Sequence, residues 1–205
     1  MYDRALQLNT EAQRYSLLKD SFGLGDLYRY RAAIFGQTGI KDSIFYYLNQ
    51  AEKISALQGS FKGVFVNKVT TVEAYLEYPD SVQKALTLAL SVCPDSSRMP
   101  QWAKYELELH LGRALLQTGK ATQGIPLIEK ATQGFIKMDM KSREQKANDI
   151  LMDYYLDMNM KDAFIRCYRR SQTFTDSLNL AEKMRAVAAA NIRFDTERKE
   201  KENTL

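Results

Sequence analysis

The feature of this sequence that most constrains its fold is a pattern that recurs at intervals near 40 residues. Four stretches open with residues typical of a turn and then share one spacing of small or apolar side chains: "GIKDSIFYYLNQAEKI", "PDSVQKALTLALSV", "GKATQGIPLIEKATQGF" and "NMKDAFIRCYRRSQTF". Their anchors at i, i+4 and i+7 share one face of a helix. The first anchors, Ile44, Val82, Gly124 and Ala163, lie 38, 42 and 39 residues apart. The pattern therefore predicts a row of stacked helical units.

The composition favours an all-α protein. The 205 residues include only 4 Pro and 10 Gly, whereas an all-β fold needs many turns. Good helix formers, among them Leu, Ala, Gln, Lys and 8 Met, are frequent. We predict helices over residues 2–19, 22–37, 41–57, 61–77, 80–93, 101–118, 121–138, 142–158 and 161–200, with the clearest break between residues 93 and 101, where two prolines lie.

The stretch "YELELHLGRALLQTGKATQGIPLIEKA" is the clearest two-helix unit. Gly112 and Gly124 are small enough to let two helices approach closely, and Leu115 and Ile128 fill the space that remains. With a turn at Gly119, this spacing resembles the tetratricopeptide repeat (TPR). The resemblance extends over roughly residues 1–180. It implies an all-α superhelix of about four helix hairpins, with an extra N-terminal helix and a long C-terminal helix.

Several positions depart from the TPR pattern. Arg31 stands where Leu is expected, Glu108 takes the usual aromatic position, and Arg170 replaces the closing Ala. The stretch "YLEYPDSV" shortens the turn of the second unit and leaves the register of its first helix uncertain. One repeat interval before Ile44 lies Ala5, so we expect "YDRALQLNTEAQ" to be the second helix of a repeat whose first helix is absent. The alternative is that this helix caps the array.

The sequence predicts no enzyme, cofactor or metal site. The single histidine, His110, cannot form a zinc site with Cys93 or Cys167 at a recognised spacing, and we interpret both cysteines as unpaired thiols. The "GLG" at residues 23–25 lacks the third glycine of a dinucleotide-binding motif. A net charge of +4, with 29 basic and 25 acidic residues well mixed, does not favour a nucleic-acid partner.

The TPR resemblance implies that the first helix of each hairpin lines a concave groove for a protein or peptide partner. The lining positions can be assigned in the first, third and fourth repeats, whereas the stretch "YLEYPDSV" leaves the second repeat without a defined register. The expected partner-binding residues are Arg29, Ala33 and Gln37; Glu106, Leu109, Arg113 and Gln117; and Gln145, Asn148, Met152 and Tyr155. They contain no cluster of several Lys and Arg, which argues against the TPR proteins that bind chaperone tails.

The last stretch of the chain, "DSLNLAEKMRAVAAANIRFDTERKEKENTL", contains no Gly or Pro. Its apolar stripe from Leu178 to Ile192 has a period near 3.5, which allows pairing with a second copy of the chain. The run from Phe194 to Glu200, after a D-S-L helix, resembles the end of the TPR region in regulatory proteins of Bacteroidetes. There it leads into a transmembrane helix and then a cytoplasmic histidine kinase or helix-turn-helix output.

This second resemblance implies a sensor module of a bacterial two-component or transcription-regulating protein. Residues 1–180 would be the repeat array on the periplasmic side of a membrane-anchored protein, and residues 181–205 would link it to an output outside this sequence. Any membrane contact would be made only through a flanking segment. The alternative function is a cytoplasmic TPR scaffold or adaptor without a membrane or signalling step.

Overall fold

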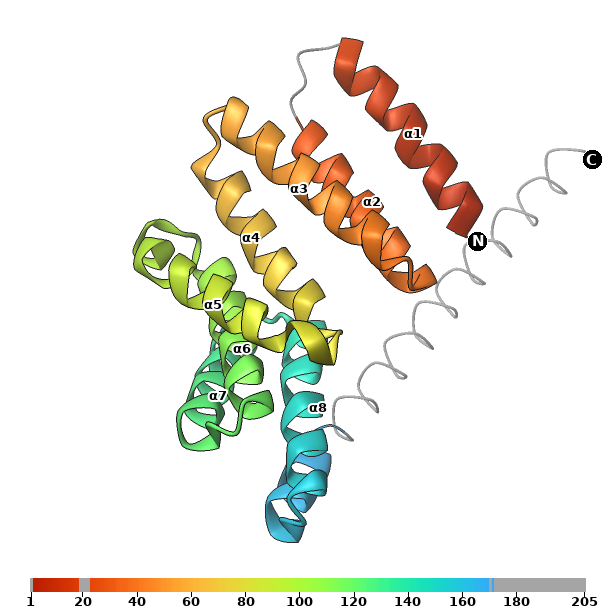
Figure 1. Ribbon diagram of the computed structural model, residues 1–205. Helices are drawn as coiled ribbons and strands as arrows, with labels where there is room; N and C mark the ends of the chain where they lie inside the picture. Colours follow the sequence, from red (N-terminus) through yellow and green to blue (C-terminus); the bar gives the residue numbers. More distant parts are fainter. Residues whose placement is uncertain (1, 19–22, 170, 172–205) are drawn as a thin grey trace, which may run out of the picture. The chain divides into compact units, whose positions relative to one another are not determined.

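The computed structural model describes residues 2–18, 23–169 and 171, and these residues form helices and turns without a strand (Figure 1). The all-α prediction is therefore confirmed. The chain divides into two compact units, Met1–Met140 and Lys141–Leu205, which we describe separately. The first unit contains α1 (Tyr2–Leu18), α2 (Leu24–Thr38), α3 (Lys41–Leu57), α4 (Phe61–Leu76), α5 (Val82–Val92), α6 (Gln101–Gln117) and α7 (Ala121–Lys137). The second begins with α8 (Lys141–Asp157), and residues 161–169 are also helical.

A shared turn geometry explains the repeat interval. Helices α3, α6, α7 and α8 are each 17 residues long. The turns that follow α2, α3, α6, α7 and α8 each contain a residue with positive φ: Gly39, Gly59, Gly119, Asp139 and Asn159. In each turn the next residue donates its N–H to a carbonyl five residues earlier, which closes the helix end. Because a 17-residue helix and a three-residue turn occupy 20 residues, a hairpin occupies 40.

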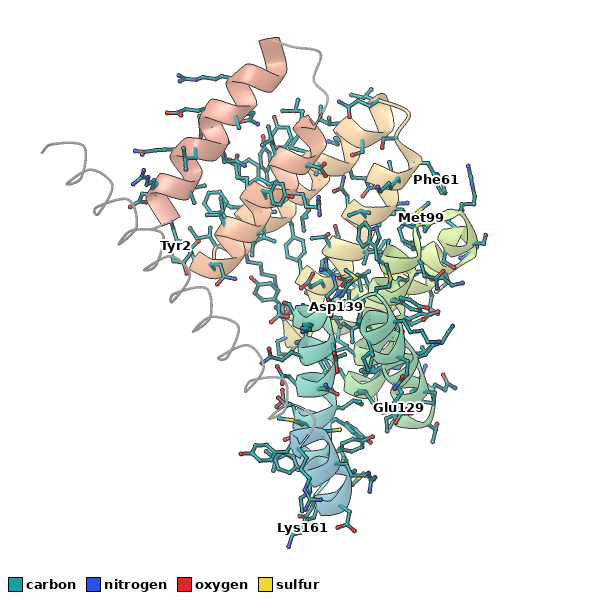
Figure 2. All side chains as sticks on the ribbon, turned by 180° about the vertical axis from the view of Figure 1, so that it is seen from behind. Tyr2, Phe61, Met99, Glu129, Asp139 and Lys161 are labelled. Carbon is teal, nitrogen blue, oxygen red and sulfur yellow. The ribbon has the colours of Figure 1, made fainter. Side chains whose placement is uncertain are left out.

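The middle of the chain departs from this regular spacing. Between α4 and α5 lies a short 3-10 helix, η1 (Pro79–Ser81), and between α5 and α6 lies a second, η2 (Cys93–Arg98). The predicted break between residues 93 and 101 is confirmed. Here the Arg98 guanidinium lies 3.9 Å from the centre of the Phe61 ring, and Figure 2 labels Phe61 and Met99 at this position. The cation–π contact ties the start of α4 to the loop before α6.

In the first unit each helix from α1 to α6 packs against the next one, and α4 also contacts α2 and α6. The predicted anchor stripes face the interior: Ile44, Leu48 and Ala51 on α3 are buried, as are Ile128 and Ala131 on α7. A larger apolar core lies between α4, α5 and α6. The i, i+4, i+7 spacing therefore identified the buried faces of α3 and α7, whereas Val82 and Cys167 are half-buried and Arg170 lies outside the described residues.

The predicted close approach of α6 and α7 is also present. A Cβ atom added to Gly112 would lie 2.6 Å from Ile128 Cγ1 and 2.8 Å from the carbonyl oxygen of Gly124. A Cβ atom added to Gly124 would lie 2.7 Å from the carbonyl oxygen of Gly112. These separations are shorter than real Cβ contacts allow, so the two backbones touch only because both residues are glycine.

Helix α1 packs on α2 through polar contacts. Buried Asn9 donates from Nδ2 to the carbonyl oxygen of Leu27 at 2.9 Å. Arg31 donates from Nη1 to Gln13 Oε1 at 3.2 Å and also hydrogen-bonds the Thr10 hydroxyl. Arg31 thus departs from the TPR pattern because its side chain reaches the preceding helix.

Predictions about the end of the chain lie mostly outside the described residues. Helix formation is observed over residues 161–169 of the predicted 161–200. The stripe from Leu178 to Ile192, the run from Phe194 to Glu200 and the predicted boundary at residue 180 lie beyond the part of the chain that the structure describes. Within the described part, none of the helices has the length and apolar character required to span a membrane.

Candidate partner-binding surface

A pocket of about 630 Å³ opens where the ends of α4 and α6 meet the start of α5. Two of the expected partner-binding residues of α6, Arg113 and Gln117, line it. The opposite wall comes from α4, η1 and α5, which form the second repeat of the sequence pattern. No partner-binding residue was predicted there. The complete lining is Leu76, Glu77, Pro79, Val82, Gln83, Arg113, Gln117 and Thr118.

An ion pair joins the two walls of this pocket. Arg113 donates from Nη1 to Glu77 Oε1 at 2.7 Å. The Arg113 side chain is 19% exposed, whereas that of Glu77 is 58% exposed. The guanidinium is therefore held against the pocket wall, and the carboxylate stands at the rim. Exposed ion pairs of this kind contribute only about 0.2–1 kcal/mol.

A second polar cluster links α4 and α6 one turn before Arg113. His110 is fully buried, with Nε2 3.4 Å from Glu106 Oε2 and 3.7 Å from Glu73 Oε2. Glu106 was an expected partner-binding residue, whereas His110 was considered as a zinc ligand and rejected. The sequence could not predict that Glu73 lies close to His110, because the two residues are on different helices. The cluster lies about one helical turn before the Glu77–Arg113 pair on both helices and does not line the pocket.

The other expected residues of the first unit do not reach the pocket lining. On α2, Ala33 and Gln37 are exposed, and Arg29 pairs with Asp26 at 2.7 Å. On α6, Leu109 is fully buried. A buried Leu109 packs within the protein and offers no surface to a partner, which its position in the TPR pattern did not reveal.

In the second unit, the expected residues of α8 divide by burial. Asn148 and Tyr155 are buried, and Gln145 and Met152 are half-buried. The first two therefore belong to the packed side of α8, whereas Gln145 and Met152 keep part of their surface accessible. Position in a repeat pattern identifies a helix face only approximately, because the face is broader than the groove.

The described residues contain no group of three or more His, Cys, Asp or Glu side chains placed to hold a metal ion. Among the same residues neither Cys93 nor Cys167 forms a disulfide. Burial raises the pKa of the Cys93 thiol, and the nearby Glu108 carboxylate raises it further. A nucleophilic cysteine needs a lowered pKa, so the surroundings of Cys93 oppose thiolate formation.

Comparison with known proteins adds no family to this description. No family model matches the chain, and no curated protein matches it. The chain is therefore classified by its structure alone. The chain is an all-α protein whose consecutive helices form hairpins, with a pocket of mixed polarity between the first helices of two neighbouring hairpins.

Proposed function

We propose that this chain is a non-enzymatic, TPR-type protein-interaction module that binds a peptide or protein segment across α4 and α6. Helices α2, α4 and α6 are the first helices of successive hairpins, and α4 contacts both of the others. One observation carries the proposal. Arg113 and Gln117, which the repeat pattern predicts to face a partner, line a single pocket with Glu77 and Gln83 of the preceding hairpin.

The pocket suits a short segment of extended chain. Leu76, Pro79 and Val82 provide apolar contact, while Gln83 and Gln117 provide amide donors and acceptors for a peptide backbone. Binding sites typically combine an apolar lining with a few polar groups that fix orientation. The walls come from two neighbouring hairpins, so a bound segment would bridge them and stabilise their packing.

A peptide library displayed on phage tests this function. Peptides selected on the wild-type protein should lose most of their affinity for a Gln117→Trp variant, because the indole fills the pocket. They should bind Gln133→Trp normally, since Gln133 is also exposed but lies on α7 outside the pocket lining. Failure to select any peptide, or equal binding by both variants, would contradict the proposal.

We further propose that the module is the periplasmic sensing region of a bacterial regulatory protein, in which partner binding shifts the C-terminal helix and thereby the output. The support is the sequence from Leu178 to Glu200, which lies outside the described residues. The residues encoded after Leu205 test this. An apolar run of about 20 residues would support the sensor, and a polar domain or a stop codon would support the cytoplasmic scaffold.

A further inference from the structure

The pocket lining contains one cation and one carboxylate, Arg113 and Glu77, and they pair with each other. The carboxyl ends of α4 and α6 and the amino end of α5 reach the pocket, so partial backbone charges of both signs meet there. The charge that the pocket presents to a partner is therefore decided by which of these two side chains moves away.

Glu77 is the side chain that can leave. It follows the last residue of α4 and is 58% exposed, so its carboxylate stays hydrated when it rotates away from the pocket. Arg113 lies within α6 with only 19% of its side chain exposed, so its guanidinium stays in place. In this less hydrated position its attraction for an anion is stronger than at the open surface.

We propose that the pocket binds a carboxylate group of the partner and that Glu77 occupies the carboxylate position in the free protein. A guanidinium has five N–H donors in a planar fork that matches a carboxylate, and the contact with Glu77 uses one Arg113 nitrogen. The apolar wall beside it, formed by Leu76 and Val82, accepts the aliphatic stem of an acidic side chain. This inference rests on the proposed function, because it names the chemistry of the bound segment.

Three sets of decapeptides test the proposal. The first two are random sequences blocked at both ends, with Glu or Gln at the central position. The third carries the central Gln and a free C-terminal carboxylate. Comparing it with the Glu set shows whether the bound carboxylate belongs to an acidic side chain or to the end of the chain. Wild-type protein should bind one carboxylate-bearing set about 10- to 100-fold more tightly than the blocked Gln set, the range for a hydrogen bond to a charged group.

Two substitutions should act in opposite directions. Arg113→Met should abolish the preference for carboxylate, whereas Arg113→Lys should retain a reduced preference because it keeps the charge and loses the fork. Glu77→Gln should strengthen binding of the preferred set by about 2- to 5-fold, because it removes the internal competitor. Lys68→Met is the matched control. It breaks the contact between Lys68 Nζ and Glu52 Oε1, which are 3.9 Å apart and lie outside the pocket lining. This variant should leave the preference for carboxylate unchanged.

The outcomes separate this inference from the proposed function. Equal binding of all three sets by wild-type protein would overturn the carboxylate site and leave peptide binding intact. Tighter binding of Lys-containing peptides by the wild-type protein, lost in Glu77→Gln, would show that the pocket takes a cation and would also overturn it. Absence of binding in every set would contradict the proposed function itself. Circular dichroism establishes that each variant is folded before its affinity is interpreted.

Discussion

Two glycines control how closely α6 and α7 approach. At this crossing the atoms in contact are backbone atoms, with the Gly112 carbonyl oxygen 2.7 Å from the position of a Cβ on Gly124. Helix interiors normally disfavour glycine by about 1 kcal/mol relative to alanine. The packing gained by close approach therefore offsets a local penalty in both helices.

Replacing Gly112 by alanine should destabilise the protein. The new methyl group would overlap Ile128 Cγ1 and the backbone of Gly124, and such overpacking costs about 1–3 kcal/mol, partly offset by the better helix propensity of alanine. We expect a net loss of about 1–2 kcal/mol in the free energy of unfolding, measured in urea. Gly36→Ala on α2 is the control: no atom lies within 4 Å of its Cβ position, so it should stabilise by up to about 1 kcal/mol. Equal stabilisation by both changes would contradict the close approach.

At the scale of helices, polar contacts replace apolar ones where the sequence departs from the TPR pattern. Glu108 occupies the position expected to be aromatic, is buried, and accepts a hydrogen bond from Lys130 Nζ at 2.6 Å. This contact joins α6 to α7. Arg31, in place of the expected Leu, lies with its guanidinium 5.3 Å from the centre of the Tyr47 ring on α3 and also contacts α1.

Breaking the Glu108–Lys130 contact should weaken the α6–α7 hairpin. Lys130→Met leaves the buried carboxylate without its cation and should lower the free energy of unfolding by about 1 kcal/mol, a modest value because Lys130 is 59% exposed. The double variant Glu108→Leu/Lys130→Met should recover most of this loss, because it removes both charges together. Urea unfolding of both single variants and the double variant gives the coupling energy. A double variant no more stable than Lys130→Met would show that the ion pair is not the cause.

At the scale of the first unit, stability should vary along the chain. Helix α6 contains ten buried residues, from Ala103 to Leu116, and lies between other helices of the stack. By contrast, among the α1 residues whose side chains are described, one residue is buried, Asn9. In stacked helical arrays each unit is stabilised mainly by its neighbours, so elements with few buried contacts open first.

Native-state hydrogen exchange should reveal this difference. Amides of α1 should exchange through local opening, while those of α6 should require far larger unfolding. Asn9→Ala removes the hydrogen bond to the Leu27 carbonyl, worth about 1 kcal/mol, and should speed exchange in α1 about 5-fold without changing α6. Gln7→Ala, an exposed change on the same helix, should leave both rates unchanged. A uniform change across α1 and α6 would mean that the unit opens as a whole.

The sequence alone predicted the helices, their turns and their buried stripes. The predicted helix 41–57 matches α3 residue for residue, and 101–118 differs from α6 by one residue. These features follow from local rules, because a helix repeats every 3.6 residues and a turn needs residues that tolerate positive φ. The close pair Gly112 and Gly124 was predictable for the same reason, since both lie within one hairpin.

The tertiary structure alone decided which side chains meet between helices. Glu77 faces Arg113 and Glu73 faces His110 across two helices, and Glu108 pairs with Lys130, which lies 22 residues later. The same packing buries Leu109, although the repeat pattern placed it in the groove. Such contacts depend on how far each helix is rotated and shifted against its neighbours. The sequence predicted a shortened turn after α4, but the connection to α5 contains η1 and is longer than the three-residue turns. Periodicity within a helix specifies which face is buried, but it does not specify the side chain on the facing helix that this face meets.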